Sequence, residues 1–200
     1  GGYTPLHEAA EKNHLAICRL IMNCQVDKNP RDSIGLTPLH YAARDGHLAL
    51  CLSILLNVEE KNPKDDDGKA PLHYAVEKGH IEICRLIIEY ADEKNPSDLY
   101  GTTVFHAAAE RGNLEICQLM IENVHGELPQ DNIGFTPLDT AIEYDQFNAF
   151  KLIFQYMKET NLLSKIGFRT LRLAIEQGHI EMCKFMIDNG VQLNPRNADG

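Results

Sequence analysis

A glycine recurs every 33 residues along the whole chain, with no insertion between copies. The positions are Gly2, Gly35, Gly68, Gly101, Gly134, Gly167 and Gly200. Because a fixed period of this length is typical of repeat proteins, it has to be interpreted before any single motif. The period defines six copies, residues 2–34, 35–67, 68–100, 101–133, 134–166 and 167–199. We therefore expect a single repeat array over residues 1–200.

The second copy shows how one unit can be built from its own residues. Thr37 suits a helix N-cap, and Pro38 suits the first helical position, where its missing N–H costs nothing. Gly46 can end that helix in the left-handed conformation. Apolar residues then recur at helical spacing over residues 48–55, until Asn62 and a proline break the pattern. Each copy is predicted to form a helix, a turn, a second helix and an extended finger.

A short block follows most of the glycines and carries a family resemblance. Thr-Pro-Leu-His stands in the first two copies, and related blocks stand in the others. Together with the 33-residue period, this block resembles the ankyrin-repeat family. The resemblance implies a mainly α solenoid of helix–turn–helix units with extended β-hairpin-like fingers, whose core forms by stacking. Both ends of the chain fall inside the pattern, so we expect a fragment of a longer array.

Composition excludes several classes of function. The formal net charge of −10 argues against nucleic acid or an anionic membrane as the main partner. No apolar run approaches the roughly 20 residues that cross a bilayer, and no signal peptide opens the chain. We expect no direct membrane contact and a cytoplasmic location, with the nucleus left open.

Cysteines and histidines repeat with the same period and are interpreted as packing groups. Equivalent residues of adjacent copies lie about 8–10 Å apart, whereas a disulfide needs Cα atoms within about 7 Å. The ladder comprises Cys18, Cys51, Cys84, Cys117 and Cys183. We expect these thiols in the core, and Cys24, which falls outside the ladder, to be exposed.

The histidine ladder consists of His7, His40, His73 and His106, which cannot converge on one ion. The resemblance implies that this histidine braces the turn beside the threonine that begins the helix. Asp139 and Arg172 occupy its place in copies five and six, so no shared reaction depends on it. His14, His47, His80 and His179 open the second helices and also fit turn bracing. We expect no enzyme, cofactor, metal or small-molecule substrate, and an enzyme using the histidines is the weakest alternative.

In ankyrin proteins the variable surface is the concave side, which the fingers and the first helices form. The resemblance therefore implies candidate partner-binding residues next to each framework glycine or histidine. These candidates are Ile34, Leu36, Tyr41, Tyr74, Tyr100, Ile133, Phe135, Ile166 and Phe168, and the acidic cluster on one finger adds Asp66 and Asp67. Exposed aromatic residues often anchor interfaces, although some of these could instead pack against the next finger.

The acidic fingers favour a partner protein with an apolar strip flanked by Lys or Arg. The alternative for the acids is that they only keep the array soluble. The first functional hypothesis is a protein–protein interaction scaffold. The second is a cytosolic arm, acting as spacer, spring or adaptor, of a larger channel, toxin or ubiquitin-ligase assembly. Copy five departs most from the pattern, and we expect a less regular, more mobile segment between residues 124 and 170.

Overall fold

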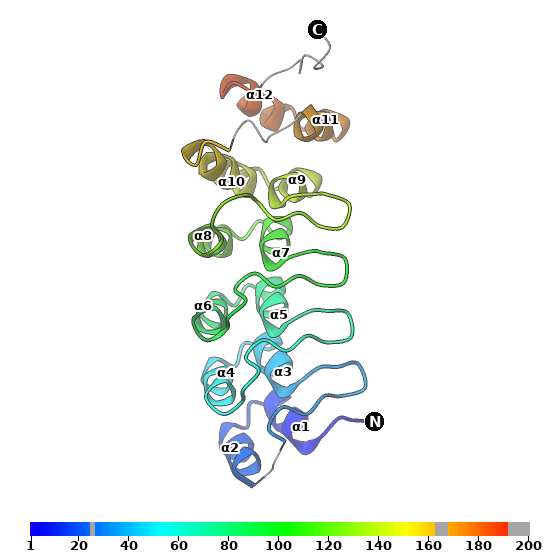
Figure 1. Cartoon of the computed structure of the whole chain (residues 1–200), viewed down its shortest axis with the longest axis vertical. Coiled ribbons are helices and arrows are strands. Elements are labelled where there is room, and N and C mark those ends of the chain that lie inside the picture. Colours follow the sequence, from blue (N-terminus) through cyan, green and yellow to red (C-terminus); the bar gives the residue numbers. More distant parts are fainter. Residues whose placement is uncertain (25–26, 163–167, 192–200) are drawn as a thin grey trace. The chain divides into compact units, whose positions relative to one another are not determined.

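The structure is a computed structural model, and it describes residues 1–24, 27–162 and 168–191. In these ranges the chain forms twelve helices (Figure 1). The chain divides into two compact units, Gly1–Val104 and Phe105–Gly200. The first unit contains α1 (Pro5–Glu11), α2 (Leu15–Cys24), α3 (Pro38–Arg44), α4 (Leu48–Leu55), α5 (Pro71–Lys78) and α6 (Ile81–Tyr90). The second contains α7 (Val104–Glu110, which starts on the last residue of the first unit), α8 (Leu114–Asn123), α9 (Pro137–Glu143), α10 (Phe147–Glu159), α11 (Phe168–Glu176) and α12 (Ile180–Asp188).

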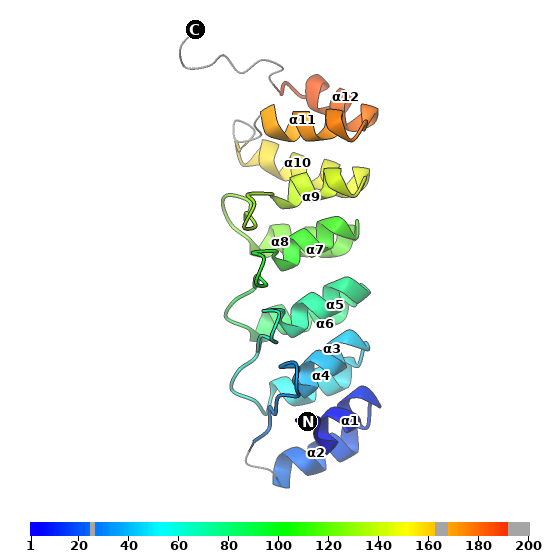
Figure 2. The same ribbon diagram turned by 90° about the vertical axis from the view of Figure 1, so that its right-hand side faces the viewer.

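Each repeat contributes one pair of antiparallel helices, as the periodicity predicts. Four of the first helices start with a proline that follows an extended N-cap residue, Thr4, Thr37, Ala70 or Thr136. Gly79 ends α5 in the left-handed conformation, with φ of 75°. Within the first unit α3 packs between α1 and α5, and α4 packs between α2 and α6 (Figure 2). Within the second unit α9 contacts α11, and α8 contacts α10.

The fingers between repeats are extended loops rather than β-hairpins. In the first finger, Asp32 N donates to Leu36 O at 2.9 Å, and the Asp32 carboxylate accepts from the backbone of Ile34 and Leu36. In the described residues, the only β pairing outside helices is an isolated bridge between Ser97 and Thr103. The predicted hairpin-like fingers are therefore not shown, because aspartate side chains take the backbone donors that a strand ladder would use.

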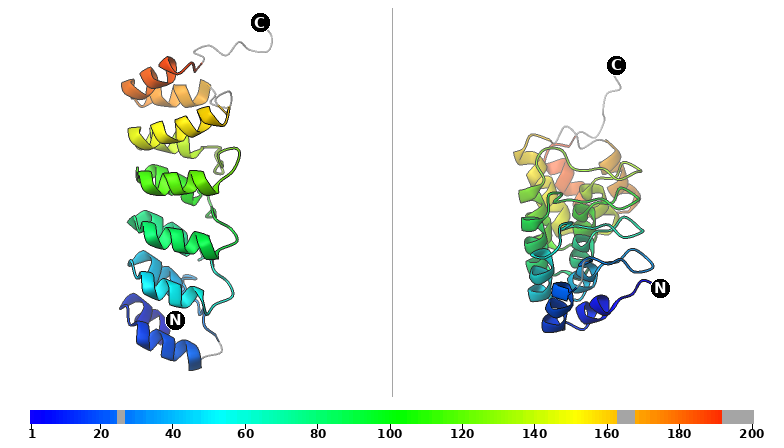
Figure 3. Two further views of the ribbon diagram at one scale, coloured as in Figure 1. Left: turned by 90° about the vertical axis from the view of Figure 1, so that its left-hand side faces the viewer. Right: turned by 60° about the horizontal axis from the view of Figure 1, so that its bottom comes forward.

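Consecutive fingers of the first unit lie one after another (Figure 3, right), and backbone hydrogen bonds tie them together. Asp66 N donates to Ile34 O at 3.1 Å, and Leu99 N donates to Asp67 O at 3.0 Å. A glycine is needed here because the next finger comes so close. A Cβ on Gly35, whose φ is 80°, would lie 2.8 Å from Asp66 N. The fingers therefore form a continuous row within this unit.

The cysteine ladder lies in the core, as the period predicts. All six cysteines are free, four of the ladder members are buried, and Cys183 is half-buried. Burial raises the pKa of Cys18 to about 11, and that of Cys51 to about 12. Cys24 is exposed, which confirms the expectation for the one cysteine outside the ladder. The buried thiols are neutral packing groups at physiological pH.

Candidate protein-binding surface

In the repeats that carry them, the ladder histidines contact the start of the first helix and tie it to the next repeat. His40 Nδ1 accepts hydrogen bonds from Thr37 N at 2.9 Å and from Thr37 Oγ1 at 3.0 Å. Because Nδ1 is the acceptor, the proton is on Nε2, which donates to Lys69 O in the following repeat at 3.1 Å. Burial lowers the pKa of His40 to about 4, so the neutral ring persists at physiological pH.

The same arrangement recurs along the ladder. The Nε2 atoms of His7, His73 and His106 donate to Leu36 O, Thr102 O and Phe135 O. Two histidines of the second set bridge in the opposite direction, since His47 and His80 donate to carbonyls of the preceding repeat. In the part of the chain that the structure describes, no three His, Cys, Asp or Glu residues are grouped so that they could hold a metal ion. These imidazoles connect repeats to one another.

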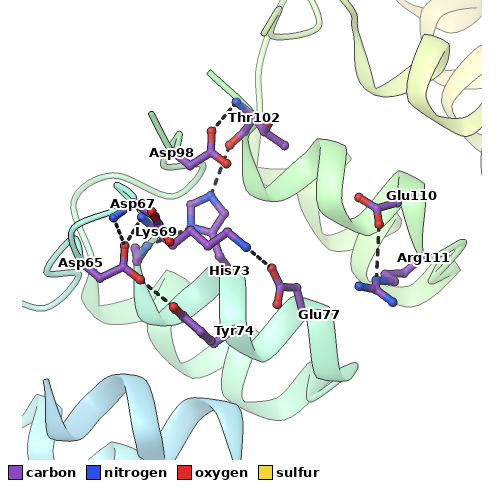
Figure 4. Close-up of polar contacts among 11 residues, drawn as sticks. Asp65, Asp67, Lys69, His73, Tyr74, Glu77, Asp98, Thr102, Glu110 and Arg111 are labelled. Carbon is purple, nitrogen blue, oxygen red and sulfur yellow. Dashed lines mark hydrogen bonds and ion pairs between the residues drawn. The ribbon is translucent and has the colours of Figure 1, made fainter. Parts of the chain in front are cut away.

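Two candidate tyrosines are held by the preceding finger. Tyr41 Oη donates to Asp32 at 2.7 Å, and Tyr74 Oη donates to Asp65 at 2.6 Å (Figure 4). Burial, and then the bond to Asp32, raises the pKa of Tyr41 to about 12. Tyr41 and Leu36 are buried, so the expectation that they are exposed is wrong, and Tyr74 is half-buried. Their side chains fill the space between a finger and the first helix that follows it.

Other candidates lie at the finger tips and face solvent. Ile34 is 57% exposed, and Tyr100 and Ile133 are each 73% exposed. Leu99 is 65% exposed beside Tyr100, although the sequence reasoning did not select it. The signal was available, because Leu99 stands two residues before a framework glycine, where the other copies carry Ser, Asp, Asn, Lys or Ala.

The remaining candidates differ in their surroundings. Asp66 and Asp67 are exposed on the second finger. Phe135 is half-buried, and the Arg169 guanidinium lies 4.7 Å from its ring centroid. Ile166 and the side chain of Phe168 fall outside the described residues. The structure thus brings Ile34, Asp66, Asp67 and Tyr100 into one row of fingers in the first unit, whereas Ile133 and Phe135 belong to the second.

The comparison with known families agrees with this geometry. A model of ankyrin repeats, in three copies, matches residues 6–98 and 91–164. The chain belongs to the ankyrin-repeat family. A comparison with curated proteins found no match.

Ankyrin repeats generally mediate protein–protein interaction, and the family consists typically of non-enzymatic scaffolds. The helical ankyrin fold is found in this chain, and His7, His40 and His73 brace the helix start as the resemblance implies. No helix in the described ranges combines the length and the apolar character that crossing a bilayer requires. A partner can therefore contact only those finger and helix residues whose side chains remain exposed once the repeats have packed together.

Proposed function

We propose that the chain binds a segment of another protein along the finger row of its first unit. The row consists of Ile34, the pair Asp66 and Asp67, and the pair Leu99 and Tyr100. Backbone bonds hold the three fingers in register, so an acidic tip lies between two apolar tips. This alternation is the observation that carries the proposal. It fits a segment whose apolar side chains are separated or flanked by Lys or Arg.

The phenol of Tyr100 provides a direct test. Replacing an exposed aromatic anchor with serine removes its contact area, and we expect at least about tenfold weaker capture of the partner by Tyr100→Ser. Tyr144→Ser is the matched control, because Tyr144 is 50% exposed but caps the end of α9 in the second unit and is not part of the finger row. Quantitative affinity purification compares both variants with the wild-type chain.

Reversal of charge at the middle finger makes the test specific for partner chemistry. Asp66→Lys with Asp67→Lys should release the same proteins that Tyr100→Ser releases, since all three residues belong to one row. Binding should also weaken when salt is raised from about 0.1 M to about 0.5 M, because exposed charge pairs are screened. Partners that both variants retain at wild-type levels would refute the proposed surface.

An intracellular location fits the cysteine chemistry. All six thiols are free, and a chain with this many unpaired cysteines suits a reducing compartment. This supports a partner that is itself an intracellular protein.

A further inference from the structure

The outer face of α4 differs from that of every other second helix. The residues that stand where α4 has Leu52 are Arg19, Arg85, Gln118, Lys151 and Lys184. Those that stand where it has Leu56 are Asn23, Glu89, Glu122, Gln155 and Asp188. Leu52 is 37% exposed and Leu56 is 62% exposed. Only the second repeat therefore presents apolar side chains at these two outward positions.

The buried side of α4 is changed in the opposite sense. Ser53 is buried at a position where the other second helices have Leu20, Leu86, Leu119, Leu152 and Phe185. Arg19 Nε of α2 donates to Ser53 Oγ at 3.1 Å, which satisfies the hydroxyl. Helix α4 therefore exposes leucines at two outward positions and buries a serine at an inward one. Core packing alone does not explain this combination.

Missing neighbours do not account for the exposure of these leucines. Helix α4 lies between α2 and α6 of the same unit and contacts both (Figure 3, left). Leu52, Leu56 and Asn57 of the α4 segment, with Met22 and Asn23 of α2, line a groove between the two helices. Leu48, Leu52 and Leu56 are four residues apart, so they form a strip about 12 Å long on one side of the helix.

We propose that this strip and groove bind a single amphipathic helix of a partner protein. The strip is one side chain wide and is bordered by polar residues of α2 and α6. A stable dimer needs about 800 Å² from each copy, of which such a strip supplies a minor part. A lone helix instead lays apolar residues of i, i+3, i+4 and i+7 spacing into the groove.

The charges around the strip define the flank of that helix. Glu82 and Glu89 of α6 are exposed, and neither forms an ion pair with another described residue. Glu59 follows the helix and is exposed as well. The positive groups nearby are Arg85, between the two α6 glutamates, Arg19, which is bonded to Ser53, and Lys61, which donates to Leu55 O and Val58 O. Along α6 two exposed glutamates stand against one arginine, so the partner helix carries Lys or Arg on the side that faces α6.

The experiment uses the whole chain and a fluorescein-labelled model peptide of about 18 residues, which forms five helical turns. The peptide has leucines at i, i+3, i+4 and i+7 spacing and lysines elsewhere. The test variant is Leu52→Arg with Leu56→Glu, which gives α4 the residues that α6 has and leaves net charge unchanged. Ile180→Gln, at a 65% exposed position of α12 outside both proposed surfaces, is the control, and a scrambled peptide of equal composition tests helix geometry.

Fluorescence anisotropy should show at least about tenfold weaker binding by the double variant and wild-type binding by Ile180→Gln. The scrambled peptide should bind at least about tenfold more weakly than the patterned one. The single variant Leu56→Gln, a milder change, should show an intermediate loss. Circular dichroism and urea unfolding check that each variant is folded.

Several results would overturn the proposal. They are failure of the wild-type chain to bind the patterned peptide, retention of binding by the double variant, and equal binding of the scrambled peptide. A concentration-dependent dimer in sedimentation velocity that the double variant abolishes would assign the strip to a second copy instead. Co-sedimentation with phosphatidylcholine vesicles that the double variant abolishes would assign it to a membrane surface. The finger row could still bind its own partner in all these cases.

Discussion

The second and fifth repeats solve the same structural problem with different chemistry. In the second, His40 Nδ1 accepts from the backbone N–H and hydroxyl of Thr37. In the fifth, Asp139 Oδ2 accepts from the same two groups of Thr136, at 3.0 and 2.9 Å. Both side chains are buried. Towards their own helix start, an imidazole and a carboxylate are therefore interchangeable.

Towards the following repeat the two side chains have opposite roles. His40 donates to a carbonyl, Lys69 O, whereas Asp139 Oδ1 accepts from a hydroxyl, Thr170 Oγ1, at 2.8 Å. A carboxylate has no proton to donate. The residue 29 positions after Asp139 is Phe168, where α11 has already begun, so its carbonyl serves the helix. The framework residue is thus selected by whether the next repeat offers an acceptor or a donor.

The largest expected effect comes from placing the aspartate where the histidine belongs. In His40→Asp, a buried carboxylate would face Lys69 O. Both groups are hydrogen-bond acceptors, so no hydrogen bond can form between them. We expect the free energy of unfolding to fall by about 4 kcal/mol, as for a buried charge that has lost its partner. Urea unfolding followed by circular dichroism measures this loss, because the chain has no tryptophan for fluorescence.

His40→Asn is the matched control for that substitution. Its amide oxygen can accept from Thr37 while its NH₂ donates towards Lys69 O. The acceptor role and the donor role of His40 are therefore both kept. The free energy of unfolding should fall by about 1 kcal/mol. Equal losses for the two variants would show that donor and acceptor roles are unimportant at this position, and the comparison between the repeats would fail.

Acidification should weaken the histidine repeats next. Burial lowers the pKa of His40 to about 4 and also lowers that of His73. The unfolded chain binds these protons near pH 6.5, so the stabilisation is complete above that pH and is lost as the pH falls towards 4. For His40 alone the free energy of unfolding should drop by about 2–3 kcal/mol between pH 7 and pH 4.5.

The pH effect has an internal check in the same variant. His40→Asn carries no group that titrates in this range, so its unfolding free energy should depend less on pH than that of the wild type. Urea unfolding at pH 7, 5.5 and 4.5 gives both curves. Parallel curves would mean that His40 takes up its proton at the same pH in the folded and the unfolded chain.

Most of the fold was predictable because one local pattern is repeated. Proline after an extended cap, glycine after the first helix and cysteine in the second helix each specify local structure or burial, and stacking follows from their recurrence. The less regular segment expected over residues 124–170 is formed in part by two ordinary helices, α9 and α10. Residues 163–167 of that segment lie outside the described residues, and its mobility remains a prediction.

The candidate surface was less predictable, because exposure depends on distances between repeats. Tyr41 and Tyr100 both look like anchors in the sequence, yet Tyr41 reaches Asp32 of the preceding finger, while Tyr100 is at a tip. The outer face of α4 could have been found by aligning the six copies. The family resemblance places partners on the fingers and the first helices, so it gives no reason to select a second helix.

The smallest expected effect is the reverse exchange in the fifth repeat. In Asp139→His, Nδ1 can accept from Thr136, and Nε2 can donate to Thr170, whose hydroxyl both donates and accepts. We expect the free energy of unfolding to fall by about 1 kcal/mol, because the imidazole ring is larger than the carboxylate and not because a donor or acceptor is left unpaired. Urea unfolding measures it alongside His40→Asp.

The difference between the stability losses of His40→Asp and Asp139→His is more informative than either loss alone. A hydroxyl tolerates both framework residues because it can turn its proton, whereas a backbone carbonyl tolerates only a donor. Adding Thr170→Val to Asp139→His removes the hydroxyl and leaves Nε2–H without its acceptor, so a further loss of about 1–3 kcal/mol should appear. If the added change has no effect, Thr170 is not the group that accepts from histidine in this repeat. The tolerance of both framework residues would then not come from the hydroxyl.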